Sequence, residues 1–242
     1  MNGLRGAIGL LTILPAGRGL GWQGAAMVPW FPLVGLILGG LWAGFDAVAG
    51  LVFTPPLRAG LDVLFLMALT GGLHLDGLAD TADGILSHRD REEALRIMKD
   101  SRIGAWGVLA LVSVLALKGL ALSGPLPGER WISLLLVPAY GRLAMVLAIW
   151  ILPYGRGEEG IASELFSGKG TGQWVPGAAV LGAGSILLGW PAILVINGAF
   201  LAVVALIISF YRSRMGCVTG DMLGALGEVT ETALLIAVAI HL

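Results

Sequence analysis

The feature that most constrains this chain is a series of long apolar blocks, which run through nearly its whole length. A helix of about 20 apolar residues spans the hydrocarbon core of a bilayer, which is about 30 Å thick. Hydrophobic residues make up 57% of the 242 residues and charged residues only 13%, whereas about a quarter of an ordinary soluble domain is charged. The sequence therefore predicts an all-α, polytopic transmembrane helical bundle, with residues 1–242 forming a single integral membrane domain.

About seven blocks are long enough, or nearly long enough, to cross a membrane. We place the crossings at residues 28–53, 58–74, 104–122, 131–152, 174–189, 191–209 and 222–242. The fifth and sixth are the weakest, because each is under 20 residues and only the Trp190-Pro191 turn separates them. A re-entrant hairpin over 174–209 is the alternative. Near the N-terminus, Leu4, Ile8 and Leu11 fall at helical spacing and predict an interfacial helix.

Polar residues gather in three loops, which alternate crossings place on one face of the membrane. These loops are residues 75–103, 153–173 and 210–221. With the N-terminal segment, that face carries eleven basic residues, while the opposite face has two, Arg58 and Arg130. An excess of Lys and Arg marks the cytoplasmic side. The sequence thus predicts a multi-pass protein of the cell inner membrane, in contact with lipid, whose polar loops face the cytoplasm.

Charge and cysteine content exclude several other classes of protein. The net charge is −1 and no long basic run occurs, so the chain lacks the electrostatic footprint of a nucleic-acid binder. Cys217 is the single cysteine and cannot form an internal disulfide, which favours a small buried apolar role. Glycines four residues apart, Gly35/Gly39 and Gly40/Gly44, predict close helix packing. These features are compatible with a homo-oligomer but do not require one.

The strongest chemical signal is the motif HLDGLADTADG at residues 74–84, in which Asp76, Asp80 and Asp83 stand at i, i+4 and i+7. On a helix these positions share one face. Three unpaired carboxylates so close together repel each other unless a cation joins them. Mg²⁺ suits this role because it prefers hard oxygen ligands and bridges carboxylates to phosphate oxygens. The alternative is a solvated acidic face.

A second acidic motif, GDMLGALGEVTE at residues 220–231, places Asp221, Glu228 and Glu231 near one helix face. At a rise of about 1.5 Å per residue, the two glutamates lie on the order of 10 to 15 Å into the last crossing. An ionised carboxylate at that depth is costly and indicates a functional site, with a metal or other partner. Packing of polar residues or an ion relay is the alternative.

Between the two motifs, DREEALRIMKDSRIG at residues 90–104 predicts an interfacial helix that begins with a capping box. The arginine at its end offers a forked pair of donors to a phosphate. The alternative is the ordinary positive charge of a cytoplasmic loop. The predicted substrate-phosphate contacts in this loop are Lys99, Asp100, Ser101 and Arg102.

Arg142 lies near the middle of the fourth crossing, where it either pairs with a buried carboxylate or contacts a substrate phosphate. Asp46, Asp62 and Lys118 lie close enough to the outer ends of their crossings to reach water. His74 is either a base or a polar loop residue. A weaker element is PYGRGEEG, beginning at Pro153, which contains Arg156, Glu158 and Glu159.

Three motifs in this order, HLDGLADTADG, IMKDSRIGAWG and TGDMLGALGE, resemble the cobalamin synthase family, the adenosylcobinamide-GDP ribazoletransferases. The similarity runs along the whole chain and is sharpest at residues 71–107 and 219–231. The resemblance implies a membrane enzyme of late cobalamin biosynthesis. Its reaction joins adenosylcobinamide-GDP to alpha-ribazole or alpha-ribazole 5'-phosphate and releases GMP.

The implied chemistry is a magnesium-dependent phosphoryl transfer, in which a ribose hydroxyl attacks the cobinamide-side phosphorus. We expect Asp76, Asp80, Asp83 and Asp221 to be the metal ligands. Glu228 supplies either a contact to a second metal or the general base, which must lie within hydrogen-bond reach of the hydroxyl. The residues that bind guanine are not assigned by the motifs.

Two other classes of protein compete with this interpretation. A secondary transporter would use intramembrane Asp, Glu and Arg as an ion pathway, but no inverted repeat is evident and the carboxylates gather toward one face. Another membrane diphosphate-cleaving transferase, of the CDP-alcohol phosphotransferase type, would also bind metal through aspartates. The chain lacks the arginine and later aspartate spacing of that type, and it lacks the DDxxD pattern of prenyltransferases.

Overall fold

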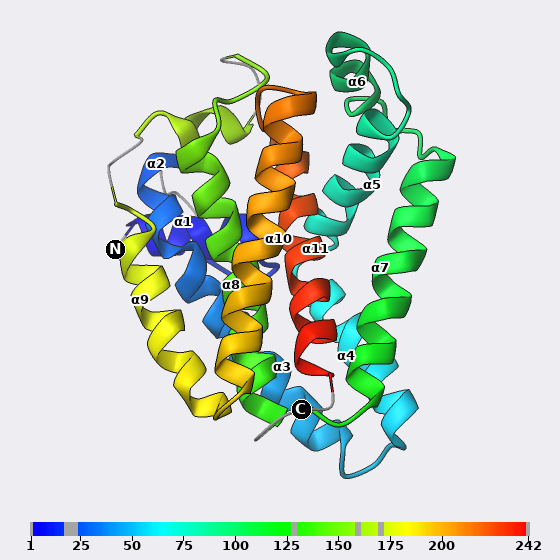
Figure 1. The fold of residues 1–242 in the computed structure, drawn as a ribbon, viewed down its shortest axis with the longest axis vertical. Helices are drawn as coiled ribbons and strands as arrows, with labels where there is room; N and C mark the ends of the chain where they lie inside the picture. The colour runs from blue at the N-terminus through cyan, green and yellow to red at the C-terminus, as the bar shows by residue number, and fades with distance from the viewer. Residues whose placement is uncertain (1, 17–23, 127–129, 158–160, 169–171, 241–242) are drawn as a thin grey trace.

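The structure is a computed structural model that describes residues 2–16, 24–126, 130–157, 161–168 and 172–240. The described residues form helices and contain no β-strand, and one isolated bridge joins Tyr154 to Val218. The predicted all-α class is therefore confirmed (Figure 1). In chain order the elements are α1 (Asn2–Leu11), α2 (Gly24–Met27), η1 (Val28–Trp30), α3 (Phe31–Ala49), α4 (Pro55–Leu69), α5 (Leu73–Ile85), α6 (Arg91–Ile97), α7 (Ala105–Ser123), α8 (Arg130–Ile151), η2 (Ile161–Phe166), α9 (Val175–Gly184), η3 (Ser185–Leu188), α10 (Ala192–Arg214) and α11 (Gly220–Val238).

Within the described residues, four helical segments are long and apolar enough to cross a membrane, or up to five if the bent pair α4 and α5 is one span. The four are Gly24–Ala49, Ala105–Ser123, Arg130–Ile151 and Ala192–Arg214. This confirms a polytopic membrane protein. The count of about seven is higher because it includes α9, a short helix of 10 residues, and α11, which carries three carboxylates. The exact number of crossings stays a prediction.

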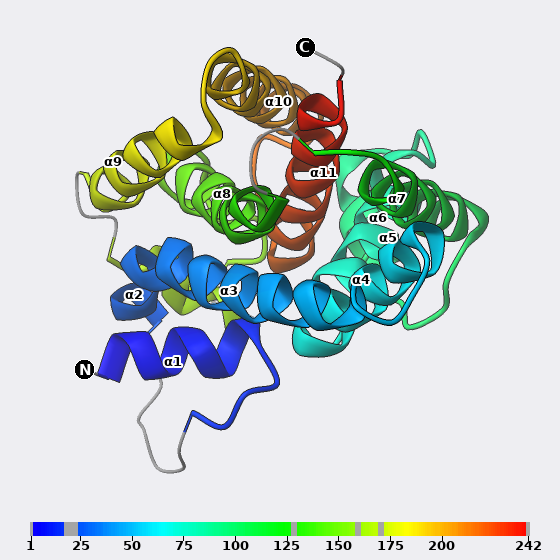
Figure 2. The ribbon, with the colours of Figure 1, turned by 90° about the horizontal axis from the view of Figure 1, so that it is seen from below.

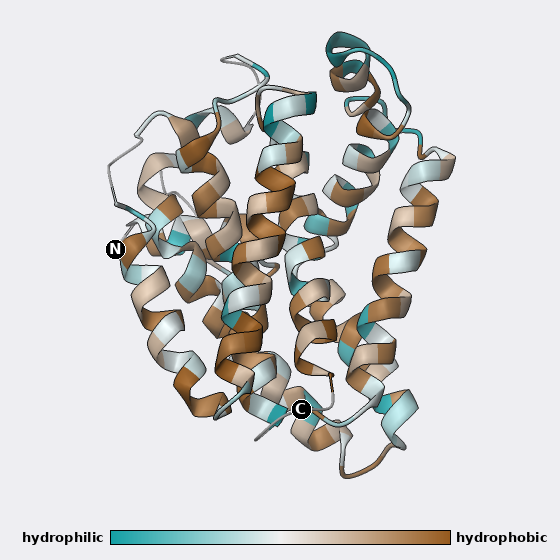
Figure 3. Cartoon of the chain, in the orientation of Figure 1, coloured by the Kyte–Doolittle hydropathy of each residue, from teal (hydrophilic) through white to brown (hydrophobic). Residues whose placement is uncertain are grey.

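Helix α8 forms the centre of the bundle, and α7 and α10 lie at its outside. In α8, 89% of the apolar window is buried, against 28% in α7 and 22% in α10. Figure 2 shows α3, α9, α10 and α11 around α8. The outer helices carry exposed apolar side chains such as Leu201 and Leu206, and Figure 3 shows their hydrophobic colouring. Apolar surface facing outward is what lipid-exposed helices require.

Close packing of α3 on α8 depends on two of the predicted glycines. A Cβ at Gly35 would lie 2.4 Å from the Cα of Ala139, and one at Gly39 would lie 2.3 Å from a backbone oxygen of α8. Gly35 and Gly39 therefore have the predicted packing role. The expectation for Gly40 and Gly44 is wrong, because a Cβ at Gly44 would meet nothing within 4 Å and one at Gly40 only the tip of a leucine side chain.

A sharp bend separates α4 from α5, and it changes the direction of the chain by 91°. Gly71 and Gly72 form the bend with φ angles of 61° and 72°, a region that L-residues with a side chain rarely adopt. The crossing predicted at 58–74 thus ends at this pair of glycines. A new helix begins at Leu73 and carries the first acidic motif.

The three polar loops lie at one end of the bundle, as predicted. Figure 1 shows the connection from α5 through α6 to α7, the end of α8 and the turn from α10 to α11 at the same end. Helix α1 lies across the long axis of the bundle in both views, and its interfacial location stays a prediction (Figures 1 and 2). Its Leu11 is buried, while Leu4 and Ile8 pack against the core.

At the opposite end, the expectation that Asp46 and Asp62 reach water is wrong. Their exposed fractions are 2% and 0%. Arg58 Nε donates to Asp46 at 2.6 Å, and Arg130 donates to Asp46 at 2.9 Å and to Asp62 at 3.1 Å. The two basic residues that we had placed on the outer face therefore turn inward to pair with carboxylates, since a buried charge needs a partner.

Candidate functional site

The first acidic motif forms the less buried face of α5. Asp76 is exposed, and Asp80 and Asp83 are half-buried, whereas the neighbouring Leu75 and Leu78 are 8% and 6% exposed. The helical spacing of the motif therefore has the predicted result, with three carboxylates on one side and apolar side chains packed on the other.

The second acidic motif meets the first where α11 crosses α5. A Cβ at Gly77 would lie 2.7 Å from the backbone oxygen of Asp221, so the glycine allows the two helices to approach closely. Helix α11 begins at this crossing because the Thr219 side chain accepts a hydrogen bond from the Met222 N–H. Asp221, in the first turn of α11, thus lies beside the carboxylates of α5.

A bridge between two loops brings Arg156 to the same place. The N–H of Val218 donates to the Pro153 carbonyl at 2.9 Å, and the N–H of Gly155 donates to the Val218 carbonyl at 3.0 Å. Arg156 Nη2 then donates to Asp221 Oδ2 at 2.6 Å. The motif that contains Arg156 is the weaker element of the sequence, yet in the structure this arginine contacts Asp221 and its charge acts on Asp80. The neighbouring Glu158 and Glu159 lie outside the described residues.

Four carboxylates of the described residues act on one another in this region. We name Asp76, Asp80, Asp83 and Asp221 the aspartate cluster. The negative charges of its other three members act on Asp80, opposed by the positive charge of Arg156. Within the described part of the chain, no group of three His, Cys, Asp or Glu side chains is placed to hold one metal ion jointly. The cluster therefore gathers hard oxygen donors with excess negative charge, but not a closed coordination shell.

Asp83 already has a structural task. Its Oδ2 accepts a hydrogen bond from the Gly104 N–H at 2.7 Å, and its Oδ1 accepts one from the Gly107 N–H at 2.9 Å. These groups lie at the start of α7, where helix N–H groups need an acceptor. Each carboxylate oxygen keeps a further lone pair. Asp83 thus holds α7 against α5, and this explains the glycines of the motif IMKDSRIGAWG.

The predicted phosphate-binding loop, residues 99–102, lies on the exposed connection between α6 and α7. Arg102 pairs with Asp100 at 2.6 Å, and the Arg102 side chain is exposed while that of Asp100 is half-buried. This contact holds the pKa of the Asp100 carboxyl at about 2. The loop follows Met98, whose carbonyl lies 3.4 Å from Arg156 Nη2. It therefore lies next to the aspartate cluster, with its arginine engaged by its own aspartate.

A cavity of about 420 Å³ opens beside the aspartate cluster. Asp76, Asp221, Arg156 and His74 contribute polar groups to its lining, and leucines, Phe31, Met145 and Tyr154 contribute apolar ones. Its walls come from α1, α3, α5, α8, η2, α11 and the loop after α8. The volume lies within the range of small-molecule sites.

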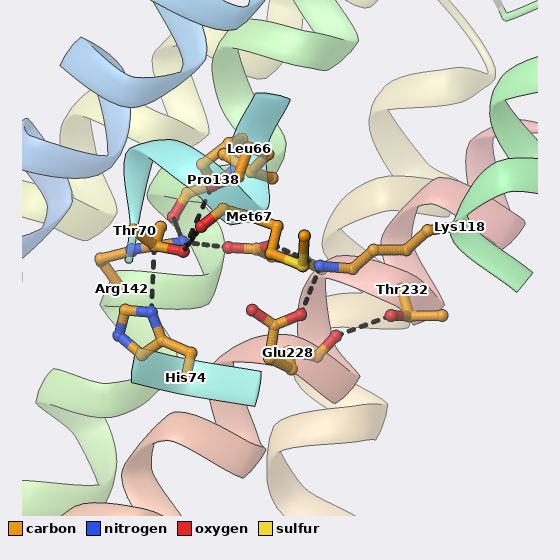
Figure 4. A network of polar contacts seen from close by, with 10 residues as sticks. Leu66, Met67, Thr70, His74, Lys118, Pro138, Arg142, Glu228 and Thr232 are labelled. Atoms are coloured by element: carbon orange, nitrogen blue, oxygen red, sulfur yellow. Dashed lines mark hydrogen bonds and ion pairs between the residues drawn. The ribbon is translucent and has the colours of Figure 1, made fainter. Parts of the chain in front are cut away.

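The two glutamates of the second motif lie deeper, in a separate set of contacts. Lys118 Nζ donates to Glu228 at 2.6 Å and to Glu231 at 2.8 Å, and Arg142 pairs with the other oxygen of Glu231 (Figure 4). We name Lys118, Arg142, Glu228 and Glu231 the buried ion network. All four side chains are at most 7% exposed. Two anions match two cations, and Glu228 does not line the described cavity.

This network corrects one expectation and decides between two alternatives. Lys118 does not reach water, because α7 packs against α5 and α11 and leaves this residue 4% exposed. Arg142 pairs with a buried carboxylate, which is the first of its two predicted roles. Arg142 Nη2 also lies 3.4 Å from Nδ1 of His74, which lines the cavity, so the network touches the site through this histidine (Figure 4).

Comparisons with known proteins agree with the motifs. A family model described as cobalamin-5-phosphate synthase matches residues 3–239. An adenosylcobinamide-GDP ribazoletransferase of Desulforamulus reducens is 40% identical over 237 residues, covering 96% of this chain and 93% of the relative. Enzymes of the same name from Synechococcus elongatus and a Roseiflexus species are 38% and 36% identical, covering 98% and 95% of this chain and 96% and 86% of those relatives. No solved structure matches the chain.

Proposed function

This chain belongs to the cobalamin-5-phosphate synthase family, transferases of late cobalamin biosynthesis, and we propose that it is a magnesium-dependent enzyme whose reaction takes place at the aspartate cluster. The reaction transfers the cobinamide phosphate of adenosylcobinamide-GDP to a hydroxyl of alpha-ribazole or its 5'-phosphate and releases GMP. The observation that carries the proposal is the convergence of two distant acidic motifs, at Gly77 and Asp221, beside one cavity.

The donor set of the cluster fits Mg²⁺. One or two of Asp76, Asp80 and Asp221 would bind the ion directly, and Asp83 would support them while it fixes the start of α7. Mg²⁺ keeps several waters and needs one or two direct carboxylates, so the remaining carboxylates can act through those waters. When bound, it would neutralise the charge of the diphosphate and of the departing GMP.

Arg156 is the cation placed to bind substrate phosphate. One of its nitrogens pairs with Asp221, while its buried Nε has no hydrogen-bond partner among the described residues. Arginine presents several donors in a planar fork, so Arg156 can bridge the cluster and a phosphate oxygen. Residues 99–102 lie at the rim of the same site and would guide the polyanionic donor.

The general base is better sought in the cavity than at Glu228. A base must come within hydrogen-bond reach of the hydroxyl that it deprotonates. Glu228 is buried with Lys118, whereas the carboxylates of Asp76 and Asp221 line the cavity. One of these two carboxylates would accept the hydroxyl proton as the new P–O bond forms and the bond to GMP breaks.

The assay that tests this proposal measures GMP. Purified protein in liposomes, without any ion gradient, should convert adenosylcobinamide-GDP and alpha-ribazole to product and release equimolar GMP when Mg²⁺ is present. A transporter has no reason to do so. Absence of GMP from folded protein supplied with both substrates, together with ion-driven uptake in the same liposomes, would favour the transporter.

We further propose that the cluster faces the cytoplasm from the inner membrane, on the basis of eleven basic residues against two. Single cysteines can be introduced at Ser87 and Ser213, at the end that carries the cluster, and at Val52 at the opposite end. The native Cys217 is 1% exposed and gives little background. An impermeant thiol reagent added to intact cells should label Val52→Cys alone. Labelling of Ser87→Cys and Ser213→Cys instead would reverse the orientation.

A further inference from the structure

The cavity beside the aspartate cluster has two chemically different sides. Leu10 and Leu11 of α1, Leu165 of η2 and Met145 of α8 supply an apolar wall. The carboxylates and the arginine of the site line the cavity from other elements, which are α5, α11 and the loop after α8. A ligand that fills this space must therefore be apolar at one end and carry hydroxyl or phosphate groups at the other.

The volume of the cavity indicates which of the two substrates can fit inside it. At about 420 Å³ it lies near the lower end of the range of small-molecule sites, which is roughly 300–1,000 Å³. A flat aromatic base on a ribose suits such a volume. The corrin ring of the donor, with its many amide side chains, is far larger, and its GDP group is too polar for a wall of leucines. The donor must therefore approach the cluster from outside the cavity.

We propose that the apolar half of this cavity binds the aromatic base of the acceptor nucleoside, alpha-ribazole. The inference rests on the proposed function and deepens it. With the base between Leu10, Leu165 and Met145, the ribose lies toward Asp76 and Asp221. The attacking hydroxyl then points at the cluster, where the diphosphate of the donor arrives from the exposed loop side.

His74 adds a polar contact within this cavity. Its Nδ1 faces Arg142, and because arginine only donates hydrogen bonds, this nitrogen is the acceptor. A neutral His74 then carries its proton on Nε2. That N–H can donate to the acceptor nucleoside, either to a ribose oxygen or to the unsubstituted ring nitrogen of the base. Arg142 of the buried ion network would in this way orient the His74 ring toward the ligand without contacting the ligand itself.

The test introduces a larger side chain at a residue that lines the cavity. Ala162 lines it from η2, and Ala162→Phe adds a ring that takes up part of the volume of the cavity. The matched control is Ala205→Phe, at an exposed position of α10 on the outside of the bundle. We expect Ala162→Phe to raise the KM for alpha-ribazole about tenfold or more, with a much smaller effect on the KM for adenosylcobinamide-GDP. The control should match the parent in both constants.

A second variant gives the opposite change. Leu165→Ala enlarges the same wall, and we expect it to improve the use of a riboside whose base carries one more fused ring, such as naphthimidazole, relative to alpha-ribazole. A rise in the KM for adenosylcobinamide-GDP alone, in folded Ala162→Phe, would overturn the proposal. So would parental KM values for both substrates, which would leave the cavity to another ligand such as a lipid acyl chain.

Equilibrium dialysis of alpha-ribazole without donor separates this inference from the proposed function. If the parent binds alpha-ribazole, and if Ala162→Phe weakens this binding while Ala205→Phe keeps it, the cavity assignment is supported. It is supported even if no GMP is formed, because the absence of GMP would contradict only the proposed transfer reaction. Turnover by the parent, together with undiminished binding in Ala162→Phe, would defeat the cavity assignment alone.

Discussion

Two acidic regions lie near each other in this bundle, and they differ in their charge balance. Among the residues that the structure describes, the aspartate cluster combines four carboxylates with Arg156, which contacts Asp221. The buried ion network combines two carboxylates with two cations, each within hydrogen-bond distance of its partner. In the balanced buried set the opposite charges compensate each other, whereas the unbalanced set is stabilised when a cation binds or a carboxylate takes up a proton.

This difference assigns separate tasks to residues that the sequence presents as similar. Asp221 and Glu228 stand seven residues apart on one helix. The first faces a cavity and the second faces Lys118. The comparison therefore predicts that neutralising Asp76, Asp80 or Asp221 in the cluster removes turnover, while neutralising a carboxylate in the network removes stability.

The largest effect on turnover is expected for Asp80→Asn, which keeps the shape of the side chain but removes its charge. We expect a loss of at least about 100-fold in the rate of GMP release, because the charge required for the cation is reduced. The amount of folded protein should stay the same or rise, since neighbouring like charges no longer repel. A variant with activity near that of the parent and unchanged Mg²⁺ dependence would exclude Asp80 as a required ligand.

The largest effect on stability is expected for Glu231→Gln. This change leaves Arg142 without a counter-charge and removes one of the two partners of Lys118, and breaking a buried ion pair costs about 3–5 kcal/mol. Thermal unfolding in detergent should show the loss. Restoring the balance gives the control: the double variant Lys118→Met, Glu228→Gln removes one charge of each sign and should unfold at a higher temperature than Lys118→Met alone. Equal melting temperatures for those two would argue against charge balance.

A medium effect is expected for Gly77→Ala, which changes no charge. Its Cβ would lie 2.7 Å from the backbone oxygen of Asp221, so α5 and α11 must separate and the two motifs with them. Turnover should fall by roughly tenfold, since small misplacements of catalytic groups are costly. Gly44→Ala is the matched control, because its Cβ meets nothing within 4 Å. Equal activity in both variants would show that the close crossing is dispensable.

The smallest effect is expected for Asp83→Asn, which tests whether Asp83 belongs more to the cluster or to the scaffold. Asparagine can accept only one of the two hydrogen bonds from Gly104 and Gly107, so the start of α7 should lose about 1 kcal/mol. Thermal unfolding should report that loss, with turnover reduced far less than in Asp80→Asn. Turnover as low as that of Asp80→Asn would make Asp83 a full member of the metal site.

The parts of the site that depend on local periodicity could be predicted from the sequence. The spacing of Asp76, Asp80 and Asp83 fixes a shared helix face wherever that helix lies, and the apolar blocks fix the membrane class. Contacts between distant segments could not be obtained in this way. Arg156 reaches Asp221 only because Pro153 and Val218 bridge two loops.

The burial of Lys118 shows the same limit. Its distance along the chain from the end of α7 suggested access to water, but its environment depends on how α5 and α11 pack against that helix. A lysine inside an apolar helix usually has a buried partner, which was the available signal. The bend at Gly71 and Gly72 was also readable as a pair of adjacent glycines, yet an unbroken crossing fitted the hydropathy equally well.

The central claim, that the unbalanced cluster binds a divalent cation for the transfer, is tested most directly by metal binding. Mn²⁺ can stand in for Mg²⁺, and its electron paramagnetic resonance signal reports the free and bound ion in the presence of adenosylcobinamide-GDP. We expect the parent to bind Mn²⁺ and Mg²⁺ to displace it. Asp80→Asn and Asp221→Asn should each weaken this binding strongly, whereas folded Glu228→Gln should retain it. Binding that is equal in the parent and both aspartate variants, or that is lost in Glu228→Gln alone, would contradict the central claim.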